Sequence, residues 1–490
     1  MTETFVIIGG DAAGMSAASK AKRDAPEMDV IVFEKGEWVS YGACGLPYYI
    51  EGRIDSLDDL VEITTEEFIE ERGIDLHINY AVEEIHPHEN TVTVTATTDD
   101  ETIAQPYDHL LIATGARAAD PPIDGLELEG VYTLHRLDEA RTIKEQIVTD
   151  HANPVADTAS GYGSEVQEYM NMGQPETIGL VGGGYISLEM AEAFETRGLD
   201  VHLFQRSPHV LTPFGAEIAT VVEDHLREQD VTLHLGSSVE RLTGENGTVS
   251  AIETGGETVL VDVALVATGV APNTDLAQQA GIDRGPTGAI ATDEYHRTNH
   301  ENVHAAGDCA EATHAITGDP VHIPLALTAN RHGRAVGQTV AGTPTRGGPV
   351  AATAALKCFD LEIARAGVGL DAEEGEERTR EAGFDPVSKT ITAGSRADYY
   401  PGGSPITIQM IADRETGRVL GAAMVGEECV AKRLDTVSTA LHAGMTVADI
   451  ERLDLSYAPP VGPIWGPVLT AAKVLNSAIR AKTETIGRNG

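Results

Sequence analysis

TFVIIGGDAAGMSAASKAKRDAPEMDVIVFEK, residues 4–35, decides the fold of the first part of the chain. The apolar run at residues 5–8 predicts a buried strand, and the glycines after it predict a tight turn. A helix is expected over about residues 14–23, followed by a second apolar strand at residues 30–33. Strand, glycine turn, helix and second strand together predict a βαβ unit that binds a dinucleotide.

Three residues of this unit have defined roles in nucleotide binding. Gly9 lets the backbone approach a pyrophosphate, Gly14 lets the helix pack closely against the strand, and Glu34 can accept hydrogen bonds from a ribose. Asp11 stands where the middle glycine is usual, which is a departure from the common motif.

The same order of strand, glycine turn, helix and second strand recurs in residues 176–206, ETIGLVGGGYISLEMAEAFETRGLDVHLFQR. Gly182 and Gly184 hold the first two glycine positions, and a serine replaces the third. The second strand ends in Gln205 and Arg206, whereas an acidic residue there would bind a ribose diol and repel a 2′-phosphate. Glutamine and arginine leave room and charge for that phosphate, so we expect NADPH, with NADH as the alternative.

Composition limits the classes of partner. The chain of 490 residues has 77 Asp and Glu against 34 Lys and Arg, a formal net charge of -43, so its overall field disfavours nucleic acid and anionic membranes. The acidic residues are dispersed, which favours a halophilic protein in a salt-rich cytoplasm; the alternative is an ordinary acidic enzyme. No signal peptide or membrane-spanning run is present in the sequence, which favours a cytoplasmic location.

The sequence predicts an α/β chain of three domains. Strands ending in Ala-Thr-Gly lie between and after the two units, and VHAAGDCAEA follows them. From about residue 343 the pattern changes: SPITIQMIADRETGRVLGAAMVG predicts an antiparallel hairpin, and DTVSTALHAGMTVADIERL predicts a helix. The expected domain limits are: 1–117, the first part of a dinucleotide domain; 118–247, a second dinucleotide domain with an inserted loop near 150–175; 248–335, the rest of the first domain; and 343–490, an α+β domain.

Cys44 lies in VSYGACGLPYYIEG, just after the second strand of the first unit. A lone cysteine is more often a small buried hydrophobic residue than a nucleophile, but this position favours a redox-active thiol. The remaining cysteines, Cys309, Cys358 and Cys429, are interpreted as packing residues. No pair has the spacing of a metal site or a local disulfide, and no metal is expected.

These motifs together resemble the flavoprotein disulfide reductases with two dinucleotide-binding domains. Within them the chain is most similar to the single-cysteine branch, which contains coenzyme A-disulfide reductase and NADH oxidase or peroxidase. The resemblance runs from about residue 4 to residue 475, through CGLPYYI, LLIATGA, VGGGYISLE, AAGDCAEA, YYPGGSPI and LSYAPPVGPIWGPV. It implies two Rossmann-like domains, which bind FAD and NAD(P)H, and a C-terminal α+β domain that forms a homodimer.

The resemblance also implies residue roles. The residues implied to bind FAD or the nicotinamide cofactor are Gly9, Gly14, Glu34, Lys35, Thr114, Gly115, Gly182, Gly184, Tyr185, Glu189, Arg206, Thr268, Gly269, Gly307 and Asp308. The residues implied to bind coenzyme A or its disulfide are Ser16, Lys20, Arg23, Ser40, Arg72 and Tyr399. The catalytic residues would be Cys44, Tyr400 and Tyr457, with Tyr457 reaching the active site of the partner subunit.

Two features favour the coenzyme A branch. Ala12 stands where the oxidases and peroxidases carry a histidine, and Tyr399-Tyr400-Pro401 matches the coenzyme A enzymes. Ala43 and Trp465 depart from the usual pattern, which affects the details of substrate binding.

The expected reaction is reduction of coenzyme A disulfide by NADPH, through flavin and a mixed disulfide between Cys44 and coenzyme A. The enzymatic alternatives are an NADH oxidase that uses a Cys44 sulfenic acid and a reductase of polysulfide or persulfide. A different class is a flavoprotein redox sensor.

Overall fold

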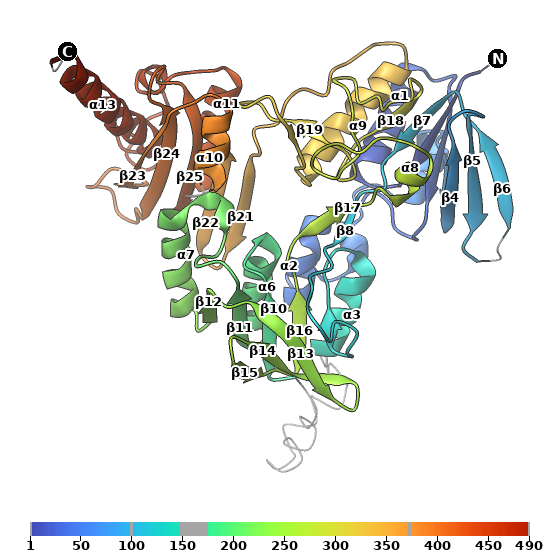
Figure 1. Ribbon diagram of the computed structural model, residues 1–490, viewed down its shortest axis with the longest axis horizontal. Coiled ribbons are helices and arrows are strands. Elements are labelled where there is room, and N and C mark those ends of the chain that lie inside the picture. The colour runs from blue at the N-terminus through green and yellow to red at the C-terminus, as the bar shows by residue number, and fades with distance from the viewer. Residues whose placement is uncertain (1, 99–100, 148–174, 371–373, 489–490) are drawn as a thin grey trace.

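The computed structural model describes residues 2–98, 101–147, 175–370 and 374–488. The inserted loop predicted near residues 150–175 lies, up to residue 174, outside the described residues. Figure 1 shows three parts: the N-terminal elements with α9 on one side, the C-terminal elements on the other, and the strands and helices of the middle of the chain between and below them.

The first domain is built on a parallel five-stranded sheet of order β18-β7-β1-β2-β3. Its strands are β1 (Thr4–Ile8), β2 (Asp29–Glu34), β3 (Asp75–Ile78), β7 (His109–Ile112) and β18 (Val303–Ala305). A small antiparallel sheet adjoins it, formed by β4 (Tyr80–His86), β5 (Thr91–Ala96) and β6 (Thr102–Pro106). The predicted strand–helix–strand order of the first unit is confirmed, because α1 (Ala12–Asp24) connects β1 to its parallel neighbour β2.

Helix α1 packs along α9 (Ala326–Val340), although more than 300 residues separate them. A side chain at Gly333 or Gly337 would collide with the backbone of Ala13 or Ala17, so the two helices meet backbone to backbone. This close pairing puts Gly333, in the middle of α9, beside the first turn of α1, at the carboxyl edge of the sheet, where ligands of such folds bind.

The second domain repeats the parallel plan with sheet order β12-β11-β10-β16-β9. Its strands are β9 (Val131–Tyr132), β10 (Thr177–Val181), β11 (Asp200–Gln205), β12 (Thr232–Leu235) and β16 (Val263–Val266). Its helices are α3 (Leu137–Ile147), α6 (Tyr185–Thr196) and α7 (Ala216–Glu228), and a hairpin sheet is formed by β13 (Val239–Glu245), β14 (Thr248–Thr254) and β15 (Glu257–Leu260).

The return to the first domain comes later than the predicted residue 248. Strand β16 pairs with β10, so it belongs to the second sheet. The chain crosses back only at β17 (Val270–Pro272), which runs antiparallel to β8 (Ala116–Ala118). An apolar strand that ends in Ala-Thr-Gly fits either sheet, and only its pairing distinguishes them. The short α8 (Asp275–Gln279), β19 (Ala312–Thr313) and β20 (Pro320–Val321) lie between β17 and α9.

The third domain is an antiparallel sheet of order β21-β22-β25-β24-β23. Its strands are β21 (Ala354–Cys358), β22 (Leu361–Gly367), β23 (Pro386–Gly394), β24 (Pro405–Asp413) and β25 (Val419–Gly426). The predicted hairpin is confirmed as β24 and β25. The predicted single helix is two helices, α11 (Val430–His442) and α12 (Val447–Ile450), with Gly444 in the left-handed region between them. The remaining helices are α10 (Glu374–Glu381) and α13 (Pro467–Arg488).

The architecture confirms the predicted class: two Rossmann-like domains and an α+β C-terminal domain. Within the described part of the chain, no helix has the length and apolar character that crossing a membrane requires.

Candidate active site

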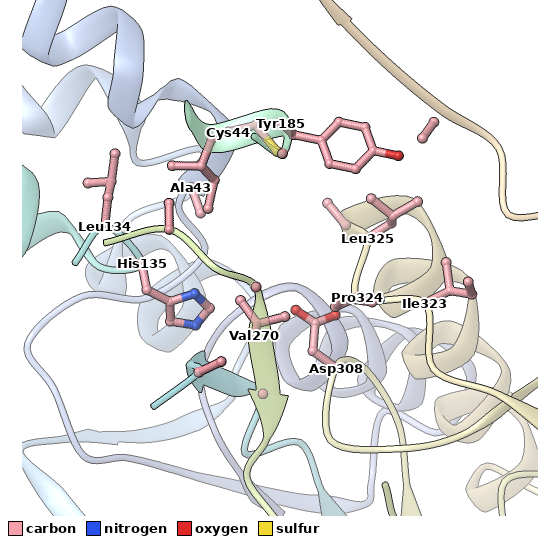
Figure 2. A pocket seen from close by; sticks show the side chains of 18 of the residues that line it. Ala43, Cys44, Leu134, His135, Tyr185, Val270, Asp308, Ile323, Pro324 and Leu325 are labelled. Carbon is pink, nitrogen blue, oxygen red and sulfur yellow. The ribbon is translucent and has the colours of Figure 1, made fainter. Parts of the chain in front are cut away.

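A cleft of about 2300 Å³ runs between the first two domains and is closed on one side by the third. Both glycine turns open into it, together with Cys44 and Asp308. In Figure 2, Cys44 and Tyr185 lie on one side of the open space, and Asp308, Val270 and Pro324 lie on the other. The cleft therefore brings both expected cofactors and the thiol into one site.

The turn of the first unit is shaped for a nucleotide. Gly9 has a φ of 108°. A side chain at this position would collide with the carbonyl of Ala113, the residue directly after β7. Likewise, a side chain at Gly14 would collide with the carbonyl of Gly9. The two oxygens of Glu34 accept hydrogen bonds from the backbone of Gly10 and Gly36, both at 2.7 Å, which fixes the carboxylate at the strand end. These features fit an FAD site. A turn without side chains lets a pyrophosphate approach the backbone, and a fixed carboxylate can accept hydrogen bonds from a ribose.

Asp11 fits the turn without being glycine, since its φ is -112°. Its carboxylate accepts a hydrogen bond from the backbone of Tyr41 at 3.2 Å, so it ties the turn to the loop that carries Cys44. Burial, followed by the nearby charge of Glu34, raises the pKa of Asp11 to about 7.

The other expected FAD residues differ in their surroundings. Gly115, Gly307 and Asp308 line the cleft. The hydroxyl of Thr114 donates to the carbonyl of Asn273 at 2.8 Å and so joins the first Ala-Thr-Gly segment to the residue that follows β17. Lys35 is exposed and does not line this cleft.

The second unit repeats the geometry with a different strand end. A side chain at Gly182 would collide with the carbonyl of Ala267, whereas a side chain at Gly184 would meet open space. Gln205 donates from its amide to the carbonyl of His209 at 3.3 Å. Arg206 is exposed, lines the cleft and has no ion-pair partner among the described residues. The expected residues Thr268 and Gly269 also line the cleft.

Cys44 lies in a short 3₁₀ turn, η1 (Ala43–Gly45), that leads into α2 (Leu46–Glu51). The thiol is exposed to the cleft, but the walls of the cleft limit its solvation. This burial, and then the charges of Glu189 and Asp308, raise its pKa. Glu189 itself has a pKa raised to about 7, first by burial and then by the like charge of Glu192. These effects favour the thiol form of Cys44 over its thiolate, beside a carboxyl group that titrates near neutrality.

Five of the six residues expected to bind coenzyme A line the cleft, and Tyr399 does not. Ser16, Lys20 and Arg23 lie on α1, and Ser40 and Arg72 lie on the two loops beside it. Lys20 is paired with Asp24 at 2.6 Å, and Arg72 is paired with Glu67 at 2.8 Å.

Sequence reasoning missed two residues of this wall. Asn330 on α9 accepts a hydrogen bond from Ser16 at 2.5 Å, and Arg334 lies one helical turn further on. Both line the cleft. Arg23 and Arg334 have no ion-pair partner among the described residues, so the wall presents two free cations. The i, i+4 spacing of Asn330 and Arg334 was visible in the sequence, but its relation to α1 was not.

The third-domain tyrosines do not lie in the cleft of their own chain. Tyr399, Tyr400 and Tyr457 are exposed, and the hydroxyls of Tyr399 and Tyr457 lie 3.4 Å apart. Trp465, which follows Tyr457 in the sequence, is half exposed, and the ammonium group of Lys473 lies over its ring. Their expected role in a partner's active site stays a prediction.

The other cysteines follow the packing interpretation with one exception. Cys309 and Cys358 are buried, and their thiols point to backbone carbonyls. For Cys429 the interpretation was wrong: this residue is exposed at the start of α11, with a left-handed φ of 58°. All four cysteines are free, and no cluster of three or more metal-binding side chains occurs among the described residues.

Comparison with known proteins gives the family. Residues 3–333 match the pyridine nucleotide-disulphide oxidoreductase model, and residues 353–465 match the dimerisation domain of the same family. The chain is 39% identical over 474 residues to a CoA-dependent NAD(P)H sulfur oxidoreductase of Pyrococcus abyssi, covering 96% of this chain and 98% of that protein. It is 27% identical to a coenzyme A disulfide reductase of Staphylococcus aureus, over 93% of this chain and 96% of that protein.

Among solved structures, an NAD-dependent persulfide reductase from A. fulgidus superposes with a TM-score of 0.87 at 36% identity. The match covers 99% of this chain and 84% of that one. The fold, the paired nucleotide turns and these relatives agree: the chain belongs to the FAD-dependent pyridine nucleotide-disulphide oxidoreductases.

Proposed function

We propose that the protein is an NADPH-dependent flavoenzyme that reduces coenzyme A disulfide to two coenzyme A thiols, with Cys44 as its redox-active thiol. The observation that carries the proposal is the single cleft, which joins two nucleotide turns, one exposed cysteine and a cationic wall. Of the four cysteines, only Cys44 lines this cleft.

In this proposal FAD is held by the turn at Gly9, by Glu34 and by Asp308, and NADPH by the turn at Gly182 and by Arg206. When bound, FAD would relay the two electrons of a hydride from NADPH to sulfur. Arg206 is the group that would select NADPH, because an unpaired guanidinium can form charge-assisted hydrogen bonds with a 2′-phosphate.

Cys44 carries the sulfur chemistry. Its thiolate attacks one sulfur of coenzyme A disulfide, so that a new sulfur–sulfur bond forms and the first coenzyme A leaves as a thiolate. Two electrons then cleave the Cys44–coenzyme A disulfide, which restores the Cys44 thiolate and releases the second coenzyme A. Each departing thiolate takes up one proton. Glu189, whose pKa is about 7, is a proton source at the right place in the cleft.

The cationic wall would hold the phosphates of coenzyme A. Arg23 and Arg334 are the free cations, whereas Lys20 and Arg72 share their charge with Asp24 and Glu67. Tyr399, Tyr400 and Tyr457 would complete the site of the other subunit in a homodimer, which the dimerisation domain favours. Their hydroxyls could then stabilise the leaving thiolate.

A second candidate substrate is a coenzyme A persulfide or a polysulfide. The names of the relatives at 36–39% identity favour it, since these are sulfur and persulfide reductases, while the coenzyme A disulfide reductase is 27% identical. The same cysteine and the same wall would serve it, because the bond to be broken is again a sulfur–sulfur bond.

One experiment separates these possibilities. NADPH oxidation is followed with coenzyme A disulfide, coenzyme A persulfide, polysulfide, oxygen and peroxide, and the intact mass of the oxidised protein is measured. The proposal expects turnover with coenzyme A disulfide and one coenzyme A per subunit, released by a thiol reductant. Turnover with only the persulfide or polysulfide would favour the second candidate, and a single added oxygen on Cys44 would favour an NADH oxidase.

A further inference from the structure

Tyr185, the first residue of α6, is held by two neighbours in the cleft. Its ring contacts Phe214 edge to face, with centroids 5.6 Å apart. Burial raises the pKa of its hydroxyl, and the neighbouring guanidinium of Arg365 opposes this effect. Figure 2 shows the Tyr185 ring next to Cys44, along one side of the open space. Tyr185 thus lies where a ligand in the second nucleotide site would meet the thiol.

Arg365 comes from the third domain rather than from either nucleotide domain. It lies on β22, a strand paired on both sides, opposite Ala354 on β21 and Ala423 on β25. Its guanidinium donates to the carbonyl of Gly367 at 2.7 Å and lies 6.0 Å from the centre of the Phe214 ring. Three fixed groups, the Gly367 carbonyl, the Phe214 ring and the Tyr185 hydroxyl, therefore share one guanidinium, which lines the same cleft.

The second and third domains are joined firmly around this contact. A side chain at Gly215, next to Phe214, would collide with the side chain of Gln409. Gln409 also donates to Glu217 at 3.1 Å. These contacts hold the second domain against the third. The position of Arg365 relative to α6 is therefore set by the packing of two domains and not by a mobile loop.

We propose that Arg365 is a positioning residue for Tyr185, and that through it the third domain of the same chain sets the geometry of the NAD(P)H site. The inference rests on the proposed function and on the resemblance, which implies that Tyr185 binds the nicotinamide cofactor. Removing the guanidinium frees the tyrosine hydroxyl, so that the ring samples other rotamers and obstructs the cofactor for part of the time. The KM for NAD(P)H then rises, while the disulfide step at Cys44 is unaffected.

A double-mutant cycle on the holoenzyme tests this inference. The variants are Arg365→Gln, Tyr185→Phe and the double variant, with Arg365→Lys as the conservative replacement. Arg418→Gln is a matched control, because Arg418 also lies over a third-domain ring, that of Phe384 at 5.6 Å, and does not line the cleft. Anaerobic flavin reduction gives the NAD(P)H half-reaction, and reoxidation of the reduced enzyme by disulfide gives the other half.

Loss of this one polar contact between Arg365 and Tyr185 should raise the KM for NAD(P)H about three- to tenfold in each single variant. The double variant should be no worse than the poorer single variant, Arg365→Lys should recover part of the loss, and disulfide reoxidation should stay unchanged. Additive effects, equal losses in both half-reactions or no effect of Arg365→Gln would overturn the inference. If NAD(P)H does not reduce the flavin of the native enzyme, the proposed function itself is refuted.

Discussion

In the first βαβ unit the residue that ends the second strand, Glu34, accepts hydrogen bonds from Gly10 and Gly36, whereas in the second unit Gln205 donates to the carbonyl of His209. In both units the stem of this side chain packs against the residue that follows the first glycine: a Cβ added at Gly10 would lie 3.0 Å from Glu34, and a Cβ added at Gly183 would lie 3.2 Å from Gln205. The position is thus structural in both units, and the head group is what varies. A carboxylate suits a ribose diol, and an amide followed by Arg206 suits a phosphate.

The comparison also separates two kinds of chemistry. The two units bind nucleotides through backbone turns and strand ends, which requires no reactive side chain. The reactive thiol lies outside both units, on the loop after β2. Variants that disrupt the thiol, the strand ends and the surface charge separately test this division.

Replacement of Cys44 by serine should abolish disulfide reduction and spare the nucleotide chemistry. Disulfide turnover should fall on the order of a thousandfold or more, because the nucleophile is lost. FAD content and flavin reduction by NADPH should remain, and both are read from the flavin absorbance. Cys429→Ser is the control, since that thiol is also exposed but lies outside the cleft. Substantial disulfide turnover by the Cys44→Ser protein would contradict the division.

Changing the strand end of the second unit should change its nucleotide. Arg206→Ala should raise the KM for NADPH about ten- to a hundredfold, the effect of losing one charged hydrogen-bonded contact, and leave NADH nearly unaffected. Gln205→Glu, which copies the acid of the first unit, should shift preference in the same direction. Steady-state kinetics with both cofactors measures this. Arg241→Ala is the control, because Arg241 is paired with Asp124 at 3.5 Å and does not line the cleft. Equal kcat/KM values for NADPH and NADH in the native enzyme would show that Arg206 does not select NADPH over NADH.

Low salt should weaken both units together. With a formal net charge of -43, self-repulsion grows as screening is removed, and the compact state is destabilised. Dialysis from molar to millimolar KCl should lower activity several-fold, release FAD and lower the melting temperature. If only NADPH binding changes and the melting temperature does not, the salt effect is local to one unit and the predicted halophilic surface has another cause.

Replacement of Glu189 by glutamine should make Cys44 more reactive. The carboxylate raises the pKa of Cys44, so its loss lowers that pKa and increases the thiolate fraction at a given pH. Alkylation in a Cys429→Ser background should be about two- to tenfold faster above pH 7.

The pH dependence provides a check on this smallest effect. Since the pKa of Glu189 is about 7, its carboxyl group is neutral at lower pH, and the glutamine variant and the parent should then react alike. Glu240→Gln is the control, a carboxylate that lines the cleft but is not among the charges raising the pKa of Cys44. A constant ratio of rates across pH would show that Glu189 acts through packing instead.

The sequence alone determined the two βαβ units, the α+β third domain and the position of Cys44. Each of these depends on local order: glycines at fixed spacing, apolar strands, and a thiol a few residues after a strand. The residues on α1 could be identified for the same reason, because they share one helix face.

Only the tertiary structure decided which distant segments meet. It assigned β16 to the second sheet, placed Asn330 of α9 within hydrogen-bond distance of Ser16, put Arg334 in the lining of the same cleft, and brought Arg365 to Tyr185. It also showed that Lys20 and Arg72 are already paired with acids. Strand pairing, helix–helix contact and ion pairing join residues far apart in the chain, and no spacing within the sequence encodes them; the physical reason is that packing of the whole fold, and not local propensity, sets these distances.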